Sequence, residues 1–384
     1  MNGSNFPGEP MPVSWIIAGA LVILYLIWIG TFYYGWARTP SRPSEGGRVK
    51  TPVSVILPVR NEESDISVIL NDLAGQDYPQ SMLEVIVVDD HSSDLTREIV
   101  RDFIKVYGNI RYIKLEEGST GKKQAFLKGL SAANFPFILT TDADCRLTDR
   151  WVRSMVECFE ETKADLIAGP VLIKAGAGFF NKFQRLEFLS LLGSTAGSLG
   201  TGNPVMCSAA NLGFRKESFE KVRNHYDENV SSGDDVFMLQ AMYKAGMREL
   251  IFLKSRDATV MTKPQTGLRA FISQRKRWAS KSRHYKTGAS VFTSFLVFFI
   301  HFYAFLCLLF ALFHCWFLMI SAFILISKSL VDFPFLYSVT GYFGERKLMR
   351  YFPAIQVIYF FYISFTAIAA FTRISHWKGR MVKS

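Results

Sequence analysis

The chain has 384 residues, of which 49% are hydrophobic, and its formal net charge is +11. This length allows one sizeable soluble domain with membrane segments, or two soluble domains. Many basic residues flank apolar segments and no nucleic-acid-binding motif is present, so the charge favours anionic lipid headgroups or a phosphate-bearing ligand over nucleic acid. The five cysteines form neither a C-x-x-C pair nor a metal-binding spacing, which indicates reduced thiols in a cytosolic or membrane-buried setting.

The first apolar segment, residues 14–37, carries no charge and is long enough to cross a bilayer core of about 30 Å as a helix. A cleaved signal peptide fits poorly, because the first 12 residues contain no Lys or Arg and no A-x-A site follows. We therefore expect an N-terminal transmembrane helix over 1–37 and a basic linker over 38–51. Four cations in that linker place the N-terminus outside and the following chain in the cytoplasm: Arg38, Arg42, Arg48 and Lys50.

Residues 52–260 have the pattern of a single α/β domain. Four β-rich runs are predicted as strands, at 53–59, 83–90, 135–144 and 164–171. Amphipathic helices are predicted between the first three, at 64–76 and 94–108. Alternation of strand and helix predicts a parallel sheet with helices on both faces, and ligands of such sheets bind at the carboxyl ends of the strands.

Acidic residues stand at those strand ends and at the start of a later predicted helix, as the clusters Asp89-Asp90, Asp142-Ala143-Asp144 and Asp234-Asp235. Any one cluster is most simply explained as a strand end or a helix cap. Three such clusters in one domain favour a shared functional site. A D-x-D sequence offers two carboxylates to a hard divalent cation such as Mg²⁺ or Mn²⁺, which also takes oxygen ligands from substrate phosphates. The segment GSTGKK at 118–123 lacks the Walker spacing, so this is not a P-loop protein.

A basic and aromatic motif, QRKRW at 274–278, precedes the second apolar region. One interpretation is a simple anchor, because Lys, Arg and Trp collect at membrane interfaces. On a helix over 267–280, however, Gln274, Arg277 and Trp278 share a face at i, i+3 and i+4, where an amide, a guanidinium and an indole could bind one ligand. We expect an interfacial helix within 261–288, with an apolar stripe made of Leu268, Phe271, Ile272 and Trp278.

The C-terminal region, 289–374, is expected to lie in the membrane and to be followed by a basic tail, 375–384. Residues 291–327 contain no acidic or basic side chain except His301 and His314 and are long enough for two spans. A further candidate span covers 353–372, which makes four spans and an outside C-terminus, whereas the basic tail argues for the inside. Either one C-terminal segment lies in the interface or the tail breaks the rule. The scarcity of ionisable residues in the expected spans argues against a transporter.

The order of five motifs resembles the membrane-bound family-2 glycosyltransferases, which include ceramide glucosyltransferase and the cellulose, chitin, hyaluronan and poly-N-acetylglucosamine synthases. The motifs are PVRNEE (58–63), DDHSSD (89–94), DAD (142–144), GDD (233–235) and QRKRW (274–278). The resemblance implies a Rossmann-like cytosolic domain with the GT-A fold, one N-terminal helix and about three C-terminal transmembrane or interfacial helices. It also implies a nucleotide-sugar donor, usually a UDP-sugar, a Mg²⁺ or Mn²⁺ ion and inversion at the anomeric carbon.

The resemblance also assigns roles to individual residues. Asp235 would be the general base that takes the acceptor proton, and Asp142 and Asp144 would hold the metal and the diphosphate. Asn211, Asp234 and Trp278 would line the acceptor site. The donor would be bound by Pro58, Arg60, Glu62, Asp89, Asp90, Lys122, Asp142, Gln274, Arg277 and Trp278.

Two departures from the family bear on the acceptor. The stretch VMCSAANLGF at 205–214 does not match the FFCGT-like sequence of cellulose synthases, and about three C-terminal segments are few for a polysaccharide channel. We therefore expect an integral protein of the bacterial inner membrane whose cytoplasmic domain transfers a sugar to a membrane lipid or lipid-linked acceptor. The alternative is a processive synthase of a β-linked polysaccharide. A non-catalytic scaffold is disfavoured, because the acidic clusters are intact.

Overall fold

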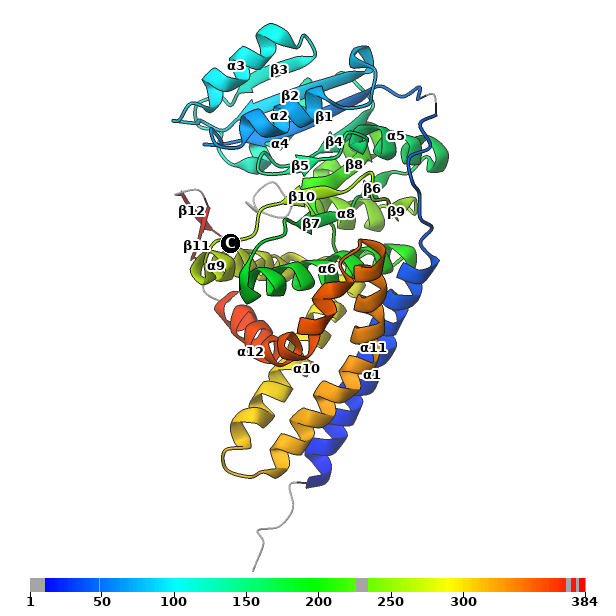
Figure 1. The fold of residues 1–384 in the computed structure, drawn as a ribbon, viewed down its shortest axis with the longest axis vertical. Helices are drawn as coiled ribbons and strands as arrows, with labels where there is room; N and C mark the ends of the chain where they lie inside the picture. The colour runs from blue at the N-terminus through cyan, green and yellow to red at the C-terminus, as the bar shows by residue number, and fades with distance from the viewer. Residues whose placement is uncertain (1–10, 48, 226–233, 371–373, 378–379, 384) are drawn as a thin grey trace, which may run out of the picture.

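The computed structural model describes residues 11–47, 49–225, 234–370, 374–377 and 380–383. An α/β domain occupies one end of the molecule, and long apolar helices extend from it at the other end (Figure 1). Between the two layers lie α6 (Gly178–Gly200) and α9 (Leu268–Ser280).

The main sheet has seven strands in the order β3-β2-β1-β4-β8-β6-β9. β3, β2, β1 and β4 are parallel, and so are β6 and β9, but β8 runs antiparallel to both of its neighbours. The expectation of a wholly parallel sheet is therefore wrong, because the chain re-enters the sheet at β8 from the opposite end after the long excursion of α6. The strands are β1 (Val53–Val59), β2 (Leu83–Asp89), β3 (Ile110–Lys114), β4 (Phe137–Thr140), β6 (Leu166–Ala168), β8 (Leu212–Arg215) and β9 (Leu250–Phe252).

Both faces of this sheet are covered, which explains why its central strands are almost continuously apolar. Along β1, Val55 and Leu57 belong to one hydrophobic core, while Ile56 between them points into the other. The first core contains α2 (Ile66–Ala74), α3 (Thr96–Val106) and α5 (Trp151–Thr162). The second contains α4 (Lys122–Ala132), α6, α7 (Lys216–Val222) and α8 (Asp234–Lys244) and continues without interruption into the long apolar helices.

A small second sheet carries the chain from the α/β domain toward α6 and α9. It has the order β5-β10-β7, with β5 (Arg146–Leu147), β7 (Val171–Ile173) and β10 (Val260–Thr262). β7 leads into α6, and β10 leads into α9. The two helices are therefore fixed relative to each other by a pair of adjacent parallel strands.

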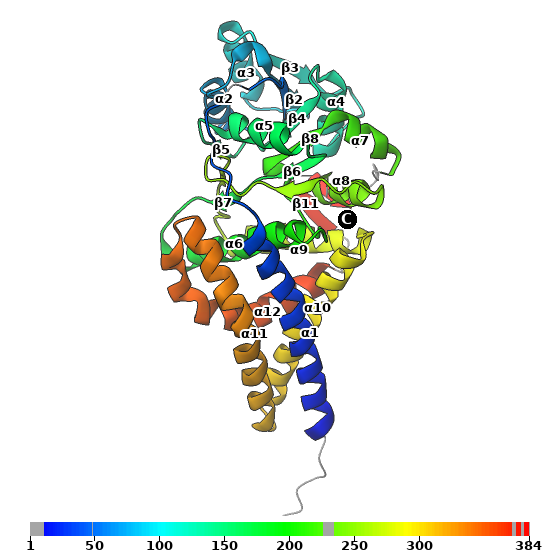
Figure 2. The same ribbon diagram turned by 90° about the vertical axis from the view of Figure 1, so that its right-hand side faces the viewer.

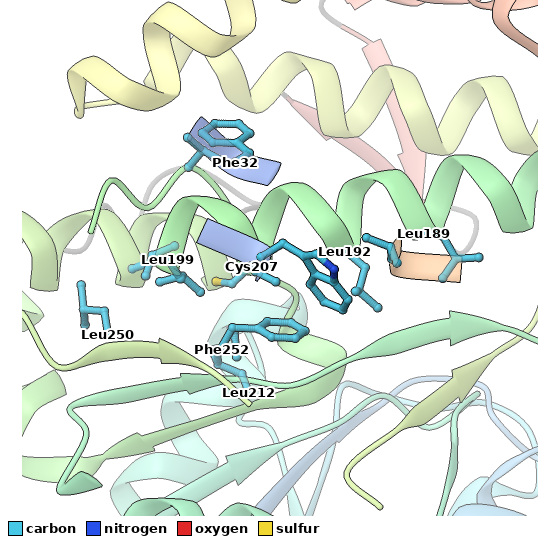
Figure 3. Close-up of a cluster of buried hydrophobic side chains, with 14 of the residues drawn as sticks. Phe32, Leu189, Leu192, Leu199, Cys207, Leu212, Leu250 and Phe252 are labelled. Carbon is cyan, nitrogen blue, oxygen red and sulfur yellow. The ribbon is translucent and has the colours of Figure 1, made fainter. Parts of the chain in front are cut away.

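α6 connects the sheet to the first long helix, α1 (Met11–Arg38). Apolar side chains of α6, among them Leu189, Leu192 and Leu199, fill the space between the strands and the long helices (Figure 3). At the crossing of the two helices the backbones touch: a Cβ on Gly35 would lie 2.0 Å from the carbonyl oxygen of Gly197. Only glycine allows this approach, so the crossing ties the α/β domain rigidly to α1.

Within the part of the chain that the structure describes, four segments are long and apolar enough to cross a membrane: Val13–Arg38 in α1, Gly288–Phe310 (α10), Trp316–Tyr342 (α11) and Arg346–Ala370. α11 extends beyond the predicted apolar region and includes Lys328 and Asp332, so the expectation that the spans lack such residues is wrong. The two charges are tolerated because Lys328 Nζ lies 2.6 Å from Asp332 Oδ2 and 2.5 Å from Gln356 Oε1.

The last of these segments, η5 (Arg346–Tyr351) followed by α12 (Phe352–Ala370), is arranged differently from the other three. Glu345, just before it, forms an ion pair with Arg185 of α6, and the carbonyl oxygen of its last residue, Ala370, accepts a 2.7 Å hydrogen bond from Arg283. Both ends thus face the α/β domain. In Figures 1 and 2, α12 stops well short of the far end that α1, α10 and α11 reach. This arrangement supports the interfacial interpretation for this segment.

Candidate functional site

A cavity lies at the carboxyl edge of the main sheet and is closed on its other side by α6 and α9. The strand register explains its composition: Val59 pairs with Asp89 and Ile56 with Thr140, so the loops after β1, β2 and β4 lie next to one another. Ten predicted site residues line this cavity: Pro58, Arg60, Glu62, Asp90, Lys122, Asp142, Asp144, Gln274, Arg277 and Trp278. Five separate segments of the sequence therefore converge on one space.

Asp90 and Arg60 form one end of the cavity. Arg60 donates from Nη1 to the carbonyl oxygen of Asp90 at 2.5 Å, and the same nitrogen lies 3.7 Å from Asp90 Oδ1. Asp90 Oδ2 accepts a 3.0 Å hydrogen bond from the backbone N–H of Gly121. Gly121 has φ 104, in the left-handed region that favours glycine, and this turn starts α4 with Lys122 as its first residue. The carboxylate thus fixes both the arginine and the loop that presents the lysine.

Lys122, Asp142 and Asp144 form the charged middle of the cavity. Lys122 Nζ lies 2.5 Å from Asp142 Oδ1, and Asp144 lines the same space two residues later. Burial, and then the charge of Asp142, raise the pKa of the Cys145 thiol, which follows Asp144 in the sequence.

The carboxylates of this cavity fit only some kinds of metal site. Among the described residues no three His, Cys, Asp or Glu side chains gather at one point, so a cation here would take two carboxylates at most. Mg²⁺ in proteins is usually bound by one or two carboxylates, and oxygen atoms of phosphate and water are its remaining ligands. The residues therefore fit a divalent ion that arrives with a diphosphate better than a permanently bound structural metal.

Asp235 lies at the start of α8 and lines a smaller adjoining cavity, which shares Pro58, Lys122 and Asp142 with the first. Its Oδ1 accepts from the N–H of Val236 at 2.7 Å and lies 3.3 Å from Lys281 Nζ, and its Oδ2 accepts from the N–H of Ala209 at 3.2 Å. Burial raises the pKa of Asp235, but Lys281, the Val236 N–H and Lys122 together outweigh it and lower the pKa below the usual aspartate value. A carboxylate in this setting is ionised at neutral pH.

The QRKRW motif lies on α9 and is divided between two sides of the helix. Gln274, Arg277 and Trp278 line the cavity, as their spacing predicts. Arg275 is 4% exposed and pairs with the equally buried Glu187 of α6, with Arg275 Nε 2.7 Å from Glu187 Oε1. The motif therefore combines a cavity-facing side with a buried anchor, and the binding roles of the cavity-facing residues stay predictions.

Two predicted site residues do not reach either cavity. Asp89 is buried, where its carboxylate accepts hydrogen bonds from Ser92 and from the hydroxyl of Tyr112 at 2.7 Å. Asn211 is 0% exposed, and its amide joins the Trp151 indole to the carbonyl oxygens of Pro170 and Ala258. Asn211 is therefore a residue of the domain interior, and its assignment to the acceptor site is corrected. The side chain of Asp234 lies outside the described residues.

Several residues that the sequence did not single out line the larger cavity or pair with a residue that lines the smaller one. Lys281 pairs with Asp235 and follows the QRKRW motif by three positions, so the helical spacing that identified Trp278 could have found it. Lys263 and Gln265 follow β10, while Gln184 and Phe188 come from one side of α6. No sequence motif marks these four, because their proximity depends on how β10 and α6 fold over the cavity.

Comparison with known proteins agrees with this geometry. Residues 54–223 match the family described as Glycosyl transferase family 2. The glycosyltransferase AglE of Haloferax volcanii is 37% identical over 199 residues, which are 50% of this chain and 62% of that protein. This chain carries a family-2 glycosyltransferase domain.

The domain's other relatives extend the likeness. The poly-beta-1,6-N-acetyl-D-glucosamine synthase of Staphylococcus epidermidis is 26% identical over 273 residues, 67% of this chain and 62% of that protein. The chain thus spans about three fifths of the length of these relatives. The mannosyltransferase PcManGT of Pyrobaculum calidifontis, solved with GDP-Man and Mn²⁺, has a TM-score of 0.58 at 18% identity and covers 92% of this chain and 99% of its own. The glycosyltransferase domain therefore has the GT-A fold. The family match ends before Asp235 and α9, so those residues rest on the structure.

Proposed function

We propose that this chain is an inverting glycosyltransferase that moves a sugar from a nucleotide-sugar donor to a hydroxyl group of a membrane lipid or lipid-linked acceptor. The observation that carries the proposal is the position of Asp235. Its ionised carboxylate adjoins the cavity that holds Lys122, Asp142 and Asp144, and α9, the far wall of that cavity, faces the long apolar helices. The proposed base, the proposed diphosphate site and the wall next to the apolar helices therefore belong to two adjoining cavities, which supports this proposal.

The charged middle of the cavity suits a nucleoside diphosphate. Lys122 and Arg277 supply cationic donors from opposite walls. A Mg²⁺ or Mn²⁺ ion held by Asp142 and Asp144 would neutralise negative charge on the departing diphosphate. Asp90 and Arg60, further along the same cavity, are the residues that we assign to the nucleoside. UDP is the nucleotide that the sequence motifs imply, whereas PcManGT was solved with GDP-Man, so both are candidates for the assay.

The chain's own residues then account for the transfer step. Asp235 takes the proton of the acceptor hydroxyl while that oxygen forms a bond to the anomeric carbon of the sugar. The bond from the anomeric carbon to the diphosphate breaks, and the nucleoside diphosphate leaves with the electron pair. Attack on the face opposite the leaving group inverts the configuration. Lys281 keeps Asp235 anionic, and Trp278 forms a flat wall that limits access of water.

A lipid acceptor is favoured by the position of α9 between the cavity and the apolar helices. α9 lines the cavity and contacts α12, which lies on the side of the apolar helices (Figure 1). A headgroup hydroxyl at the membrane surface would therefore be close to the wall of the cavity. The second candidate, a processive polysaccharide synthase, is supported by the likeness to the S. epidermidis poly-beta-1,6-N-acetyl-D-glucosamine synthase.

The same helices suggest a membrane topology. We infer three crossings, by α1, α10 and α11, with the N-terminus outside and the catalytic domain in the cytoplasm of a bacterial inner membrane. The C-terminal hairpin, β11 (Ile374–Trp377) and β12 (Arg380–Lys383), supports this inference because β11 contacts α9. Three crossings leave the basic tail on the cytoplasmic side, where the positive-inside rule expects it.

The function is tested with the purified full chain in lipid nanodiscs, incubated with radiolabelled UDP- and GDP-sugars, Mn²⁺ or Mg²⁺, and total lipid from the source organism. Label in the organic phase after extraction is the expected result, and mass spectrometry of that product identifies the acceptor. Label in aqueous material whose mass grows with time would support the polysaccharide synthase. No transfer and no donor hydrolysis from any sugar nucleotide would contradict both candidates.

The metal assignment is tested separately, with Asp144→Ala and the matched control Asp149→Ala. Asp149 is exposed in the turn after β5, five residues later in the sequence, and does not line the cavity. We expect Asp144→Ala to lose the Mn²⁺-dependent part of UDP or GDP binding in calorimetry, while Asp149→Ala keeps it. Unchanged metal dependence in Asp144→Ala would move the metal site elsewhere.

A further inference from the structure

A buried ion pair joins three helices behind the donor cavity. Glu187 of α6 and Arg275 of α9 are 3% and 4% exposed, and both carboxylate oxygens of Glu187 accept hydrogen bonds from the guanidinium group. The hydroxyl of Tyr362, on α12, donates a third hydrogen bond to Glu187 Oε1 at 2.6 Å. Burying two charges is costly, and well-packed apolar residues of similar size often stabilise a fold at least as well. Stabilisation of the fold alone therefore explains poorly why these polar side chains are buried together.

Arg275 connects the cluster to two residues of the cavity wall. Its Nη1 donates to the side-chain oxygen of Gln274, and its guanidinium carbon lies 4.1 Å from the ring centroid of Trp278. A guanidinium group has donors only, so it occupies the amide oxygen of Gln274 and leaves the amide N–H groups for other partners. Gln274 lines the cavity, and N–H donors suit the oxygen atoms of a diphosphate or a sugar hydroxyl.

We propose that Glu187 and Tyr362 are positioning residues of the transfer reaction, because they hold Arg275 in the orientation that directs Gln274 and Trp278 at the nucleoside diphosphate. This inference rests on the proposed function and adds a role for the membrane side of the protein. Tyr362 belongs to α12, so a helix at the level of the apolar bundle helps to set the geometry of the donor site. Neither Glu187 nor Tyr362 lines the cavity, so both act through Arg275.

The inference is tested with Glu187→Gln, Tyr362→Phe and Gln274→Ala, and with Glu187→Gln combined with Gln274→Ala. The primary readout is the Kd for UDP and GDP with Mn²⁺, and the second is the donor KM against kcat. Losing one well-made charged hydrogen bond typically weakens binding by about tenfold, so we expect that effect from Glu187→Gln and from Gln274→Ala, and a smaller one from Tyr362→Phe. If Glu187 acts through Gln274, the combined variant binds no more than about twofold more weakly than Gln274→Ala alone.

The matched control is Glu345→Gln, which removes the ion pair between Glu345 and Arg185 and so also breaks a link between α6 and the C-terminal helices. We expect it to leave both Kd and KM unchanged. Thermal unfolding and gel filtration identify any variant that does not fold, and Tyr362→Phe removes only one hydroxyl if Glu187→Gln proves unstable. The inference would be overturned if the fold-increase in Kd of the combined variant equals the product of the fold-increases of Glu187→Gln and Gln274→Ala. Unchanged nucleotide binding in both folded single variants would also overturn it. A wild-type chain that binds neither nucleotide and transfers no sugar would overturn the proposed function itself.

Discussion

At the scale of single residues, neighbouring members of the QRKRW motif have different environments. Arg277 lines the larger cavity, whereas Arg275, two positions earlier, is buried against Glu187. Helical spacing predicts that Gln274, Arg277 and Trp278 share a face, because that relation depends only on the period of the helix. It does not predict the partner of Arg275, because Glu187 is 88 positions away in the sequence.

The two acidic residues Asp89 and Asp90 differ in the same way. Adjacent side chains at the end of a strand point to opposite sides, so only one of the pair can face the cavity. In the structure Asp90 lines the cavity, whereas the carboxylate of Asp89 accepts a hydrogen bond from Ser92. The sequence contains both letters but does not indicate which side of the sheet carries the site.

The first prediction concerns the proposed general base. Asp235→Asn removes the carboxylate that we propose takes the proton of the acceptor hydroxyl, but keeps the size of the side chain. We expect transfer to fall by about 10²–10⁴-fold, with UDP or GDP binding within a few-fold of the wild type. The matched control is Asp102→Asn, which changes a side chain that is 73% exposed on α3. Near-normal turnover in Asp235→Asn would refute the assignment.

The pH dependence follows from the same carboxylate. Asp235 acts as a base only when ionised, and its pKa is lowered, so activity is lost as the pH falls through a value below the usual aspartate range of about 4. Lys281→Met removes the nearest charge that lowers this pKa. We therefore expect the acidic limb of kcat/KM to move to higher pH in Lys281→Met. An acidic limb that does not move would show that Lys281 has no electrostatic effect on the base.

At the scale of single elements, α9 forms a cavity wall, and the apolar stripe predicted for it is not one exposed surface, because Phe271 is buried at 1% exposure. Trp278 lines the cavity and packs against Phe188 of α6, with ring centroids 6.0 Å apart, whereas Leu268 at the start of the helix is 66% exposed. We expect Trp278→Ala to reduce transfer at least tenfold while leaving membrane insertion unchanged, since a partly buried aromatic contact is lost beside the proposed donor site. Transfer assays and carbonate extraction of membranes measure the two effects.

Leu268→Ala is the control for this prediction, because it removes an apolar side chain of the same helix away from the cavity. It should have little effect on the transfer rate. If Trp278→Ala lowers the inserted fraction and the inserted protein has normal activity, the motif is only an anchor.

A second element, α11, carries charges that the sequence analysis did not include in a span. Lys328 is 2% exposed on its side chain and forms a network with Asp332, Gln356 and the hydroxyl of Tyr25. Breaking a buried pair leaves one charge without its partner, so we expect Lys328→Met to cost about 3–5 kcal/mol of stability. Thermal unfolding in nanodiscs measures the change.

Two further variants make this measurement specific. Leu330→Ala alters a side chain on α11 that is 68% exposed and should change the unfolding temperature only slightly. Lys328→Met combined with Asp332→Leu leaves no unpaired charge, so it should recover much of the lost stability. If Lys328→Met alone is as stable as the wild type, the charges of Lys328 and Asp332 are solvated in the bundle.

At the scale of the whole molecule, the membrane topology that we propose has three crossings rather than four. Cys315 provides a native probe, because it is exposed in the turn between α10 and α11, while the other four cysteines are buried. In sealed inverted and right-side-out vesicles, we expect a membrane-impermeant maleimide to label Cys315 only from the outside. A protease site and epitope tag at the C-terminus should be cleaved only from the cytoplasmic side.

Two variants control the labelling. Cys315→Ser should remove the signal, and Ser81→Cys in that background adds a thiol at an exposed position of the catalytic domain that should react only from the cytoplasmic side. Cleavage of the C-terminal tag from the same side that labels Cys315 would mean that the segment 346–370 crosses the membrane, and the three-crossing topology would be wrong.

The sequence by itself determined the strands that end in acidic residues, the helical face of the QRKRW motif and the apolar segments long enough to cross a membrane. These features depend only on the periodicity and composition of a short stretch of chain, so local sequence is enough to predict them. Only the tertiary structure decided that β8 runs antiparallel, that Asn211 is buried, that Glu187 pairs with Arg275 and that both ends of α12 face the catalytic domain. Each of these depends on contacts between residues far apart in the sequence, where local preference allows several arrangements and packing selects one.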